Sequence, residues 1–133
     1  MTKHTGAWQG IMVHHTATDK NQTVNFIRKL HLKRGFGDVG YHYLLQRDWN
    51  GKYHLKKGRD TVYQGAHCDV GNYNNTYIGL AIIGNFEEQK ISESELQDLK
   101  DAIEHLKKKF NVSKVKLHRD VKATACPGKY IKL

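Results

Sequence analysis

Proline and cysteine are both scarce in this chain. Its 133 residues include one proline, Pro127, and two cysteines, Cys68 and Cys126. Two cysteines form at most one disulfide, so a small fold held together by many disulfides is excluded. No apolar run approaches the ~20 residues that a membrane-spanning helix needs. We therefore expect one domain, residues 1–133, that relies on an ordinary hydrophobic core, which a chain of this length can bury.

Acidic residues are also a minority, and the chain begins without an apolar segment. Lys and Arg number 22 against 13 Asp and Glu, which gives a net charge of +9 with histidine neutral. This charge favours an anionic partner such as nucleic acid, anionic lipid or an acidic cell-wall polymer, although it also suits a merely well-solvated surface. No nucleic-acid docking motif is present, so we expect no nucleic-acid partner. Residues 1–10 lack the apolar stretch of a signal peptide, which predicts synthesis in the cytoplasm.

Strand and helix patterns alternate along the chain. Ser92 and Glu95 have the spacing of a capping box, and apolar residues follow every three or four positions up to Phe110, as in an amphipathic helix. Asn50-Gly51 is typical of a hairpin turn, whereas residues 61–75 predict a long irregular stretch. The expected strands are 9–15, 41–46, 52–56, 77–83 and 115–117, and the expected helices are 21–33 and 92–110. This order predicts an α/β fold with a central mixed sheet flanked by helices.

Nine histidines are many for this length, and some of them end predicted strands. His14 and His15 end the first strand, and His118 follows the last strand eight positions before Cys126. Two histidines and one thiolate form a plausible zinc site that leaves a fourth position for water. Spacing alone leaves a second interpretation open, in which Cys126 is a small buried apolar residue and His118 an ordinary loop histidine. α/β sheets commonly place their sites where strands end in loops, so we expect a surface groove there.

Several segments together resemble one known family. The matching segments are 13–18, 38–43 with Arg47-Asp48, Gly58-Arg59, Gly65-Ala66-His67, 75–84, and 118–128. They follow the order of the zinc-dependent N-acetylmuramoyl-L-alanine amidase family, which includes small phage endolysins and the peptidoglycan recognition proteins. The resemblance covers nearly the whole chain and is more specific than any one motif. It implies an enzyme that cleaves the amide bond between N-acetylmuramic acid and L-alanine in bacterial peptidoglycan. The small size and the lack of a signal peptide favour a phage or prophage endolysin over a bacterial autolysin.

The resemblance also implies a site. Its zinc ligands are His14, His118 and Cys126, and Tyr41 is a catalytic residue. Short phage enzymes of the family have a lysine at the position of Thr124, whereas the hydrolytic recognition proteins have a threonine, as this chain does. A hydroxyl therefore replaces a cation there. Tyr41 and Thr124 would stabilise the oxyanion. Alternation along a strand leaves only one of His14 and His15 to face the metal, so His15, and likewise His42 beside Tyr41, are expected to serve in packing or behind the site.

Other expectations concern substrate and setting. His67, Asn72 and Tyr63 are candidate contacts to glycan or peptide, although each also suits an ordinary loop. Tyr41, His67 and the water itself are the candidate proton donors to the leaving amine. Cys68 is expected to be a free structural thiol. The chain is expected to act as a monomer on the cell wall, released by holin-type lysis or arriving from outside, with its basic surface contacting anionic envelope polymers or lipid. The alternative is a protein of the same fold that binds peptidoglycan without cutting it.

Overall fold

The computed structural model describes residues 1–133 and contains a five-stranded mixed sheet. The strands are β1 (Gly10–His15), β2 (Tyr43–Arg47), β3 (Tyr53–Lys57), β4 (Tyr77–Ile82) and β5 (Lys114–Leu117). Their order across the sheet is β3-β2-β4-β1-β5. Only the β2–β3 pair is antiparallel, and β2, β4, β1 and β5 run parallel. Four strands therefore bring their carboxyl ends to the same edge of the sheet.

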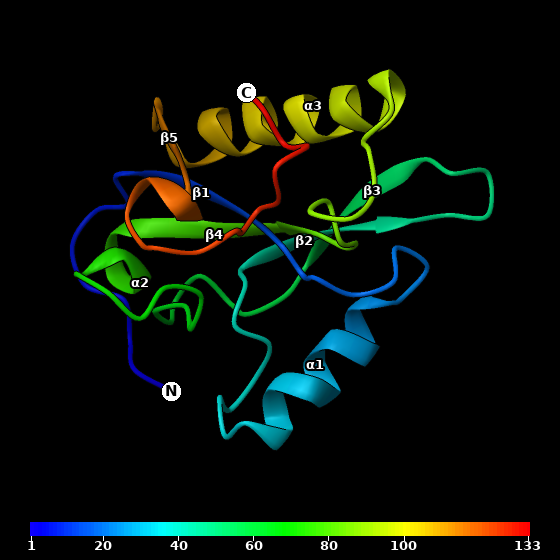
Figure 1. Ribbon diagram of the computed structural model, residues 1–133. Helices are drawn as coiled ribbons and strands as arrows, with labels where there is room; N and C mark the ends of the chain where they lie inside the picture. The colour runs from blue at the N-terminus through cyan, green and yellow to red at the C-terminus, as the bar shows by residue number, and fades with distance from the viewer.

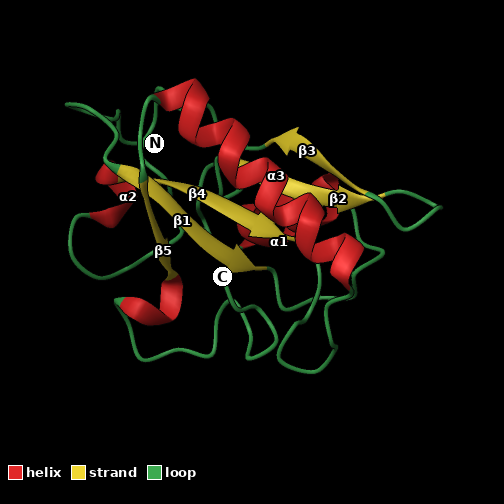
Figure 2. Ribbon diagram, turned by 90° about the horizontal axis from the view of Figure 1, so that it is seen from above, coloured by secondary structure: helices red, strands yellow, loops and turns green.

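Helices cover both faces of the sheet. Helix α3 (Glu93–Phe110) lies across one face and α1 (Val24–Lys33) lies on the opposite side, as Figures 1 and 2 show. The remaining helical elements are a single turn, α2 (Tyr73–Thr76), and a 3-10 turn, η1 (His118–Asp120). This arrangement confirms the predicted α/β class with a mixed sheet between helices. None of the helices combines the length and the apolar character needed to cross a membrane.

Most element boundaries moved by one to three residues from the predicted ones. Helix α1 begins at Val24 rather than at residue 21, because the Thr23 side chain accepts a hydrogen bond from the Phe26 amide and caps the helix there. Strand β2 begins at Tyr43 rather than at residue 41, because the Tyr41 carbonyl accepts from the Arg59 amide, outside the ladder. The irregular stretch 61–75 also contains the start of the short helix α2.

Two local signals are confirmed. Ser92 accepts a hydrogen bond from the Glu95 amide, and Glu95 in turn accepts one from the Ser92 amide, so the capping box forms at the start of α3. Asn50-Gly51 lies in the turn between the antiparallel strands β2 and β3, where Gly51 has a φ of 87° that favours glycine.

Strand β1 divides its side chains between two apolar clusters. Ile11 and Val13 belong to the larger cluster, which α3 covers through residues such as Leu99 and Leu106. Met12 points to the other face and packs with Cys68 and Tyr77. Because side chains alternate along a strand, His14 follows Met12 to this second face, whereas His15 follows Val13. The core pattern thus fixes which histidine faces which side of the sheet.

The buried histidines predict a loss of stability in mild acid. Burial lowers the pKa of both His31 and His42 to about 4. Between pH 6.5 and pH 4 the unfolded chain binds protons at these positions and the folded chain does not, so the free energy of unfolding should fall as the pH falls. Each such histidine contributes a slope of about 1.4 kcal/mol per pH unit in this window. Urea unfolding at pH 7, 6 and 5 measures it, and the slope should shrink in His31→Gln. Stability unchanged between pH 7 and 5 would contradict this expectation.

Candidate metal centre

The candidate ligands meet at the carboxyl edge of the parallel strands. His14 is the second-to-last residue of strand β1. His118 is the first residue of η1, directly after the neighbouring strand β5. Cys126 lies on the following loop, where its carbonyl accepts a hydrogen bond from the Arg119 amide. The Arg119 guanidinium holds the end of this loop by donating to the carbonyls of Gly128 and Ile131. Segments far apart in sequence are thereby fixed around one point.

The three side chains form a compact donor set. One ligand atom from each of His14, His118 and Cys126 lies within 4.8 Å of the others. The Cys126 Sγ is 3.6 Å from Nδ1 of His14, and the imidazole rings of His14 and His118 are 4.6 Å apart between centroids. Both ring nitrogens of His118 are buried and have no hydrogen-bond partner in the chain. A buried unpaired nitrogen is costly, and two nitrogens with one sulfur suit a metal such as zinc, so these residues could hold a metal ion.

The electrostatics of the donor set also favour a cation. Burial, with the nearby His67 and His118, holds the pKa of His14 well below its usual range. Burial likewise lowers the pKa of His118. Both imidazoles are therefore neutral near pH 7, which is the form that binds metals. Burial raises the pKa of the Cys126 thiol to about 11, so a bound cation is what would stabilise its thiolate.

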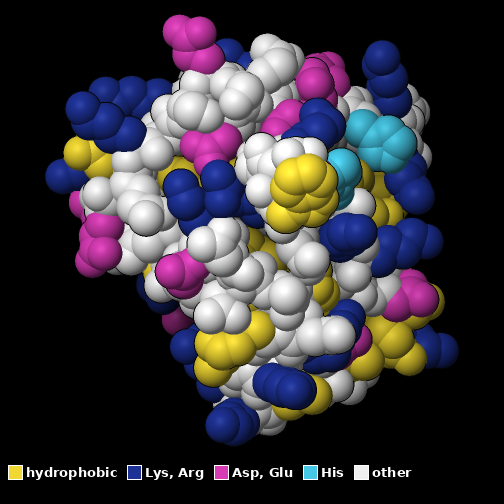
Figure 3. Space-filling model, turned by 90° about the vertical axis from the view of Figure 1, so that its right-hand side faces the viewer, with side chains coloured by type: hydrophobic (Ala, Val, Ile, Leu, Met, Phe, Trp, Pro, Cys, Tyr) yellow, Lys and Arg dark blue, Asp and Glu magenta, His cyan; other side chains and the backbone are white.

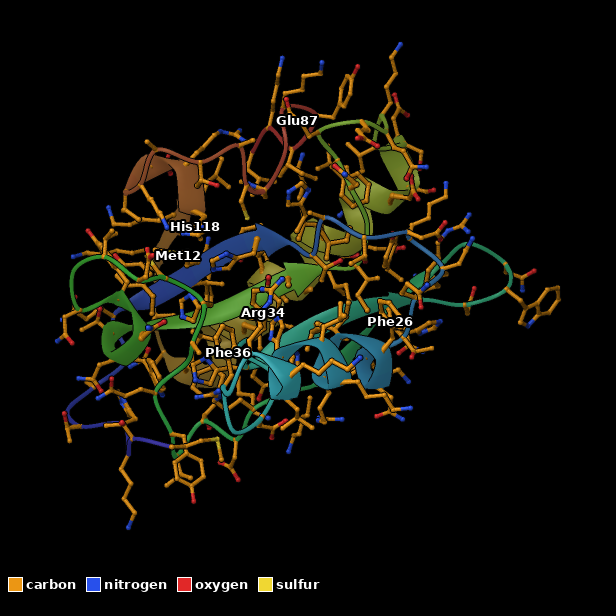
Figure 4. All side chains as sticks on the ribbon, turned by 60° about the horizontal axis from the view of Figure 1, so that its bottom comes forward. Met12, Phe26, Arg34, Phe36, Glu87 and His118 are labelled. Carbon is orange, nitrogen blue, oxygen red and sulfur yellow. The ribbon has the colours of Figure 1, made fainter.

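A cavity of about 650 Å³ opens over the three ligands. Its wall includes Tyr41 and Thr124 as well as His14, His118 and Cys126, which is the groove at the strand ends that the sequence predicted. Arg34 and Phe36, just beyond the end of α1, line the cavity from a different element than His118, as Figure 4 shows. Arg34 places a positive charge in the wall, where an anionic group of a ligand would be favoured.

Tyr41 and Thr124 lie beside the donor set. The ring of Tyr41 is 5.2 Å from the ring of His14. Burial raises the pKa of the Tyr41 hydroxyl, and the neighbouring Cys126 adds to this effect, so the hydroxyl stays protonated and can donate. The Thr124 hydroxyl oxygen accepts a hydrogen bond of 3.3 Å from the Cys126 amide, which leaves its own proton free to be donated. Two neutral O–H donors therefore face one cavity.

His15 and His42, which are next to His14 and Tyr41 in sequence, are hydrogen-bonded to backbone groups. His15 Nδ1 accepts a hydrogen bond of 3.0 Å from the Phe86 amide, on the opposite side of β1 from the ligands. His42 is 1% exposed, donates from Nε2 to the Tyr63 carbonyl and accepts from the Gly79 amide at Nδ1. Both nitrogens of His42 are therefore occupied, and Nδ1 of His15 is turned to the backbone of Phe86. Cys68 is buried and free, as expected.

The three candidate substrate contacts are placed differently from one another. His67 borders the cavity but is only 6% exposed, and both of its ring nitrogens are already hydrogen-bonded, to His14 and to the Tyr77 carbonyl. Tyr63 and Asn72 lie outside the cavity wall, where Asn72 precedes α2 and the Tyr63 backbone pairs with Lys3. The structure thus brings His67 to the groove and places Tyr63 and Asn72 elsewhere on the segment 61–76.

Arg59 and Asn74 are supporting residues for which the sequence patterns predict no role in the site. Arg59 is 4% exposed, and its guanidinium donates to the carbonyls of Val39, Gln64, Phe36 and Asp38. Its own amide also donates to the Tyr41 carbonyl, so it secures the segment that carries Tyr41. Asn74 Oδ1 accepts from the amides of His67 and Cys68. A buried arginine leaves no periodic pattern, and only the Gly58-Arg59 match drew attention to it.

An α/β fold with a His-His-Cys donor set and two hydroxyl groups beside one cavity has the arrangement of a site that could hold a metal ion. The particular family follows from comparison: a model of the N-acetylmuramoyl-L-alanine amidase family matches residues 4–129. The chain belongs to this family.

Individual relatives agree with the family assignment. The endolysin of Enterobacteria phage T3 is 31% identical over 127 residues, which cover 90% of this chain and 80% of that protein. Peptidoglycan-recognition protein SD of Drosophila simulans is 39% identical over 99 residues, covering 72% of this chain and 50% of that protein. Among solved structures, the N-acetylmuramoyl-L-alanine amidase LysC from Clostridium intestinale superposes with a TM-score of 0.80 at 29% identity, covering 98% of this chain and 86% of that chain.

Proposed function

We propose that this protein is a zinc-dependent N-acetylmuramoyl-L-alanine amidase of the endolysin type, with residues 1–133 as its catalytic domain. The observation that carries the proposal is the convergence of His14, His118 and Cys126, with both nitrogens of His118 buried and unpaired. Membership in the amidase family and similarity to phage endolysins support the substrate, which is bacterial peptidoglycan. The bond cleaved is the amide between N-acetylmuramic acid and L-alanine.

Zinc is the metal that the donor set fits best. Zinc prefers nitrogen and sulfur ligands, and three protein ligands are typical of its catalytic sites. When bound, it supplies Lewis acidity that polarises the scissile carbonyl and activates water at neutral pH. The cavity that opens over the ligands gives the substrate access from one side.

Tyr41 and Thr124 act on the oxygen of the scissile carbonyl. As the carbonyl carbon becomes tetrahedral, negative charge develops on that oxygen, and a positioned O–H donor stabilises it. The Tyr41 hydroxyl is suited to this role because burial keeps it protonated beside His14. Thr124 contributes a neutral hydroxyl next to Cys126. The catalytic aid is thus hydrogen bonding from two neutral groups rather than from a cation.

The test of the proposed function is release of new amino termini from purified peptidoglycan. Cleavage of this amide frees the amino group of L-alanine, whereas a glycosidase would release reducing sugar instead. We expect the protein to release amino groups, a chelator to stop the release, and added zinc to restore it. Zinc-loaded protein that releases none would reject the proposed function.

A second candidate function is binding of peptidoglycan without cleavage. The similarity to Drosophila recognition protein SD is the observation that favours it. The same amine-release assay separates the two, because a binder would retain peptidoglycan but release no amine. The complete donor set and the protonated Tyr41 favour the enzyme, since a binder needs neither.

The basic surface is proposed to hold the enzyme on an anionic cell envelope, where it acts after synthesis in the cytoplasm. The net charge is +9, and Figure 3 shows Lys and Arg side chains distributed over the whole of one face. Attraction between exposed charges is screened within about 8 Å at 0.15 M salt. Binding to intact cell walls should therefore weaken severalfold between 50 and 300 mM salt in a co-sedimentation assay. Binding that does not respond to salt would contradict this role of the charge.

A further inference from the structure

His67 forms a hydrogen-bonded bridge behind the candidate metal ligand His14. Its Nδ1 is 2.9 Å from Nε2 of His14, and its Nε2 is 2.9 Å from the carbonyl oxygen of Tyr77. His67 and His14 are 6% and 1% exposed. The contacts run in one line, from the backbone of β4 through His67 to the strand β1. The imidazole of His67 therefore contacts Nε2 of His14, which is the ring nitrogen that does not face Cys126.

The direction of each hydrogen bond in this line follows from chemistry. A carbonyl oxygen only accepts, so Nε2 of His67 carries the proton and donates it to Tyr77. In a neutral imidazole the other nitrogen then has no proton, and Nδ1 of His67 accepts from Nε2 of His14. Both rings are buried, and a neutral imidazole is the form that binds a metal. His14 is consequently the tautomer with its proton on Nε2, and its Nδ1 lone pair points to Cys126 Sγ, 3.6 Å away.

The surrounding residues are shaped to hold the His67 ring. A Cβ atom at Gly79 would lie 2.6 Å from Cδ2 of His67, and one at Gly65 would overlap the same atom. The two glycines therefore leave a slot for the ring, because a side chain at either position would occupy it. Asn74 Oδ1 fixes the backbone at this point by accepting from the His67 and Cys68 amides at 2.8 and 2.9 Å. The ring cannot turn its nitrogens elsewhere without leaving the slot.

We infer that His67 is a positioning residue, which sets the tautomer and ring orientation of His14 so that Nδ1 is the atom presented to the metal. This role rests on the proposed metal-dependent function. It replaces the roles of substrate contact and proton donor for His67, because neither nitrogen is free for them. Partners that orient a ligand histidine typically change metal affinity by about 10- to 100-fold.

Three variants test the role of His67. His67→Ala removes the acceptor and should weaken zinc binding by about 10- to 100-fold in competition with a chromogenic chelator. His67→Asn places an amide oxygen near the position of Nδ1 and should recover affinity to within a few-fold of the wild type. The matched control is His42→Asn. His42 is also a buried histidine, but its hydrogen bonds go to Tyr63 and Gly79, so this variant should bind zinc normally.

The direct readout is the histidine tautomer in the metal-free protein. Nitrogen NMR of the wild-type protein should show the His14 proton on Nε2 alone, and His67→Ala should lose this preference. A wild-type His14 proton on Nδ1 would overturn the inference, even if His67→Ala failed to fold. Zinc affinity of folded His67→Ala within twofold of the wild type would also overturn it. A wild-type protein that binds zinc but releases no amine would reject only the proposed activity, because tautomer and affinity are measured without substrate.

Discussion

Replacing Cys126 with serine is expected to abolish metal binding and peptidoglycan cleavage together. A serine hydroxyl does not ionise near neutral pH, so the site would lose its only anionic ligand and keep two neutral imidazoles. Zinc content after dialysis should fall from about one ion per chain to near zero, and amine release should drop by at least about 1,000-fold. Metal analysis and the amine-release assay on the same sample measure both effects.

The second cysteine supplies the control for this experiment. Cys68 is also a buried free thiol, but it packs with Met12 and Tyr77 and is not among the three grouped donor residues. Cys68→Ser should therefore keep zinc and activity close to those of the wild type. His14→Ala, which removes a different ligand of the same set, should reproduce the loss. Full activity in Cys126→Ser would refute the assignment of the metal ligands.

Removal of the Tyr41 hydroxyl is expected to give a different pattern, in which zinc stays and turnover falls. Tyr41→Phe keeps the ring that packs 5.2 Å from His14 and deletes only the O–H donor. Loss of one oxyanion donor typically lowers kcat by about 100- to 1,000-fold. Because the interaction forms mainly in the transition state, kcat should carry the loss and KM should change little.

Tyr63→Phe is the matched control, since Tyr63 lies outside the cavity wall. It should leave kcat and zinc content unchanged. A Tyr41→Phe protein with wild-type kcat would show that the hydroxyl takes no part in the reaction. A protein that had lost its zinc would instead give Tyr41 a structural role in the metal centre.

The fold could be predicted from sequence because its signals are local, whereas the ligand set followed from the family resemblance and not from spacing alone. Apolar periodicity located the two long helices, and the capping box at Ser92 placed the start of α3. Strand alternation separated His14 from His15, and the structure puts them on opposite faces of β1. Helix and strand ends were less accurate, since side-chain caps such as Thr23 decide them.

The surroundings of the ligands could not be predicted in the same way. His67 reaches His14 only because β1 and β4 pair in parallel with Met12 opposite Gly79, and that register involves residues far apart in sequence. Which side of the loop 61–76 faces the cavity depends on Asn74, which holds the backbone of His67 and Cys68. Tyr63 and Asn72 were therefore expected at the substrate although they lie outside the wall of the cavity.

The central claim is that this chain hydrolyses the amide bond of peptidoglycan through the metal centre of His14, His118 and Cys126. The most direct test measures free amino groups released from purified peptidoglycan by the wild-type protein, by the chelator-treated protein, and by the treated protein after one equivalent of zinc. The account predicts release, loss of release and recovery, in that order. Release that persists at full rate in metal-free protein, or no release by zinc-loaded protein, would contradict it.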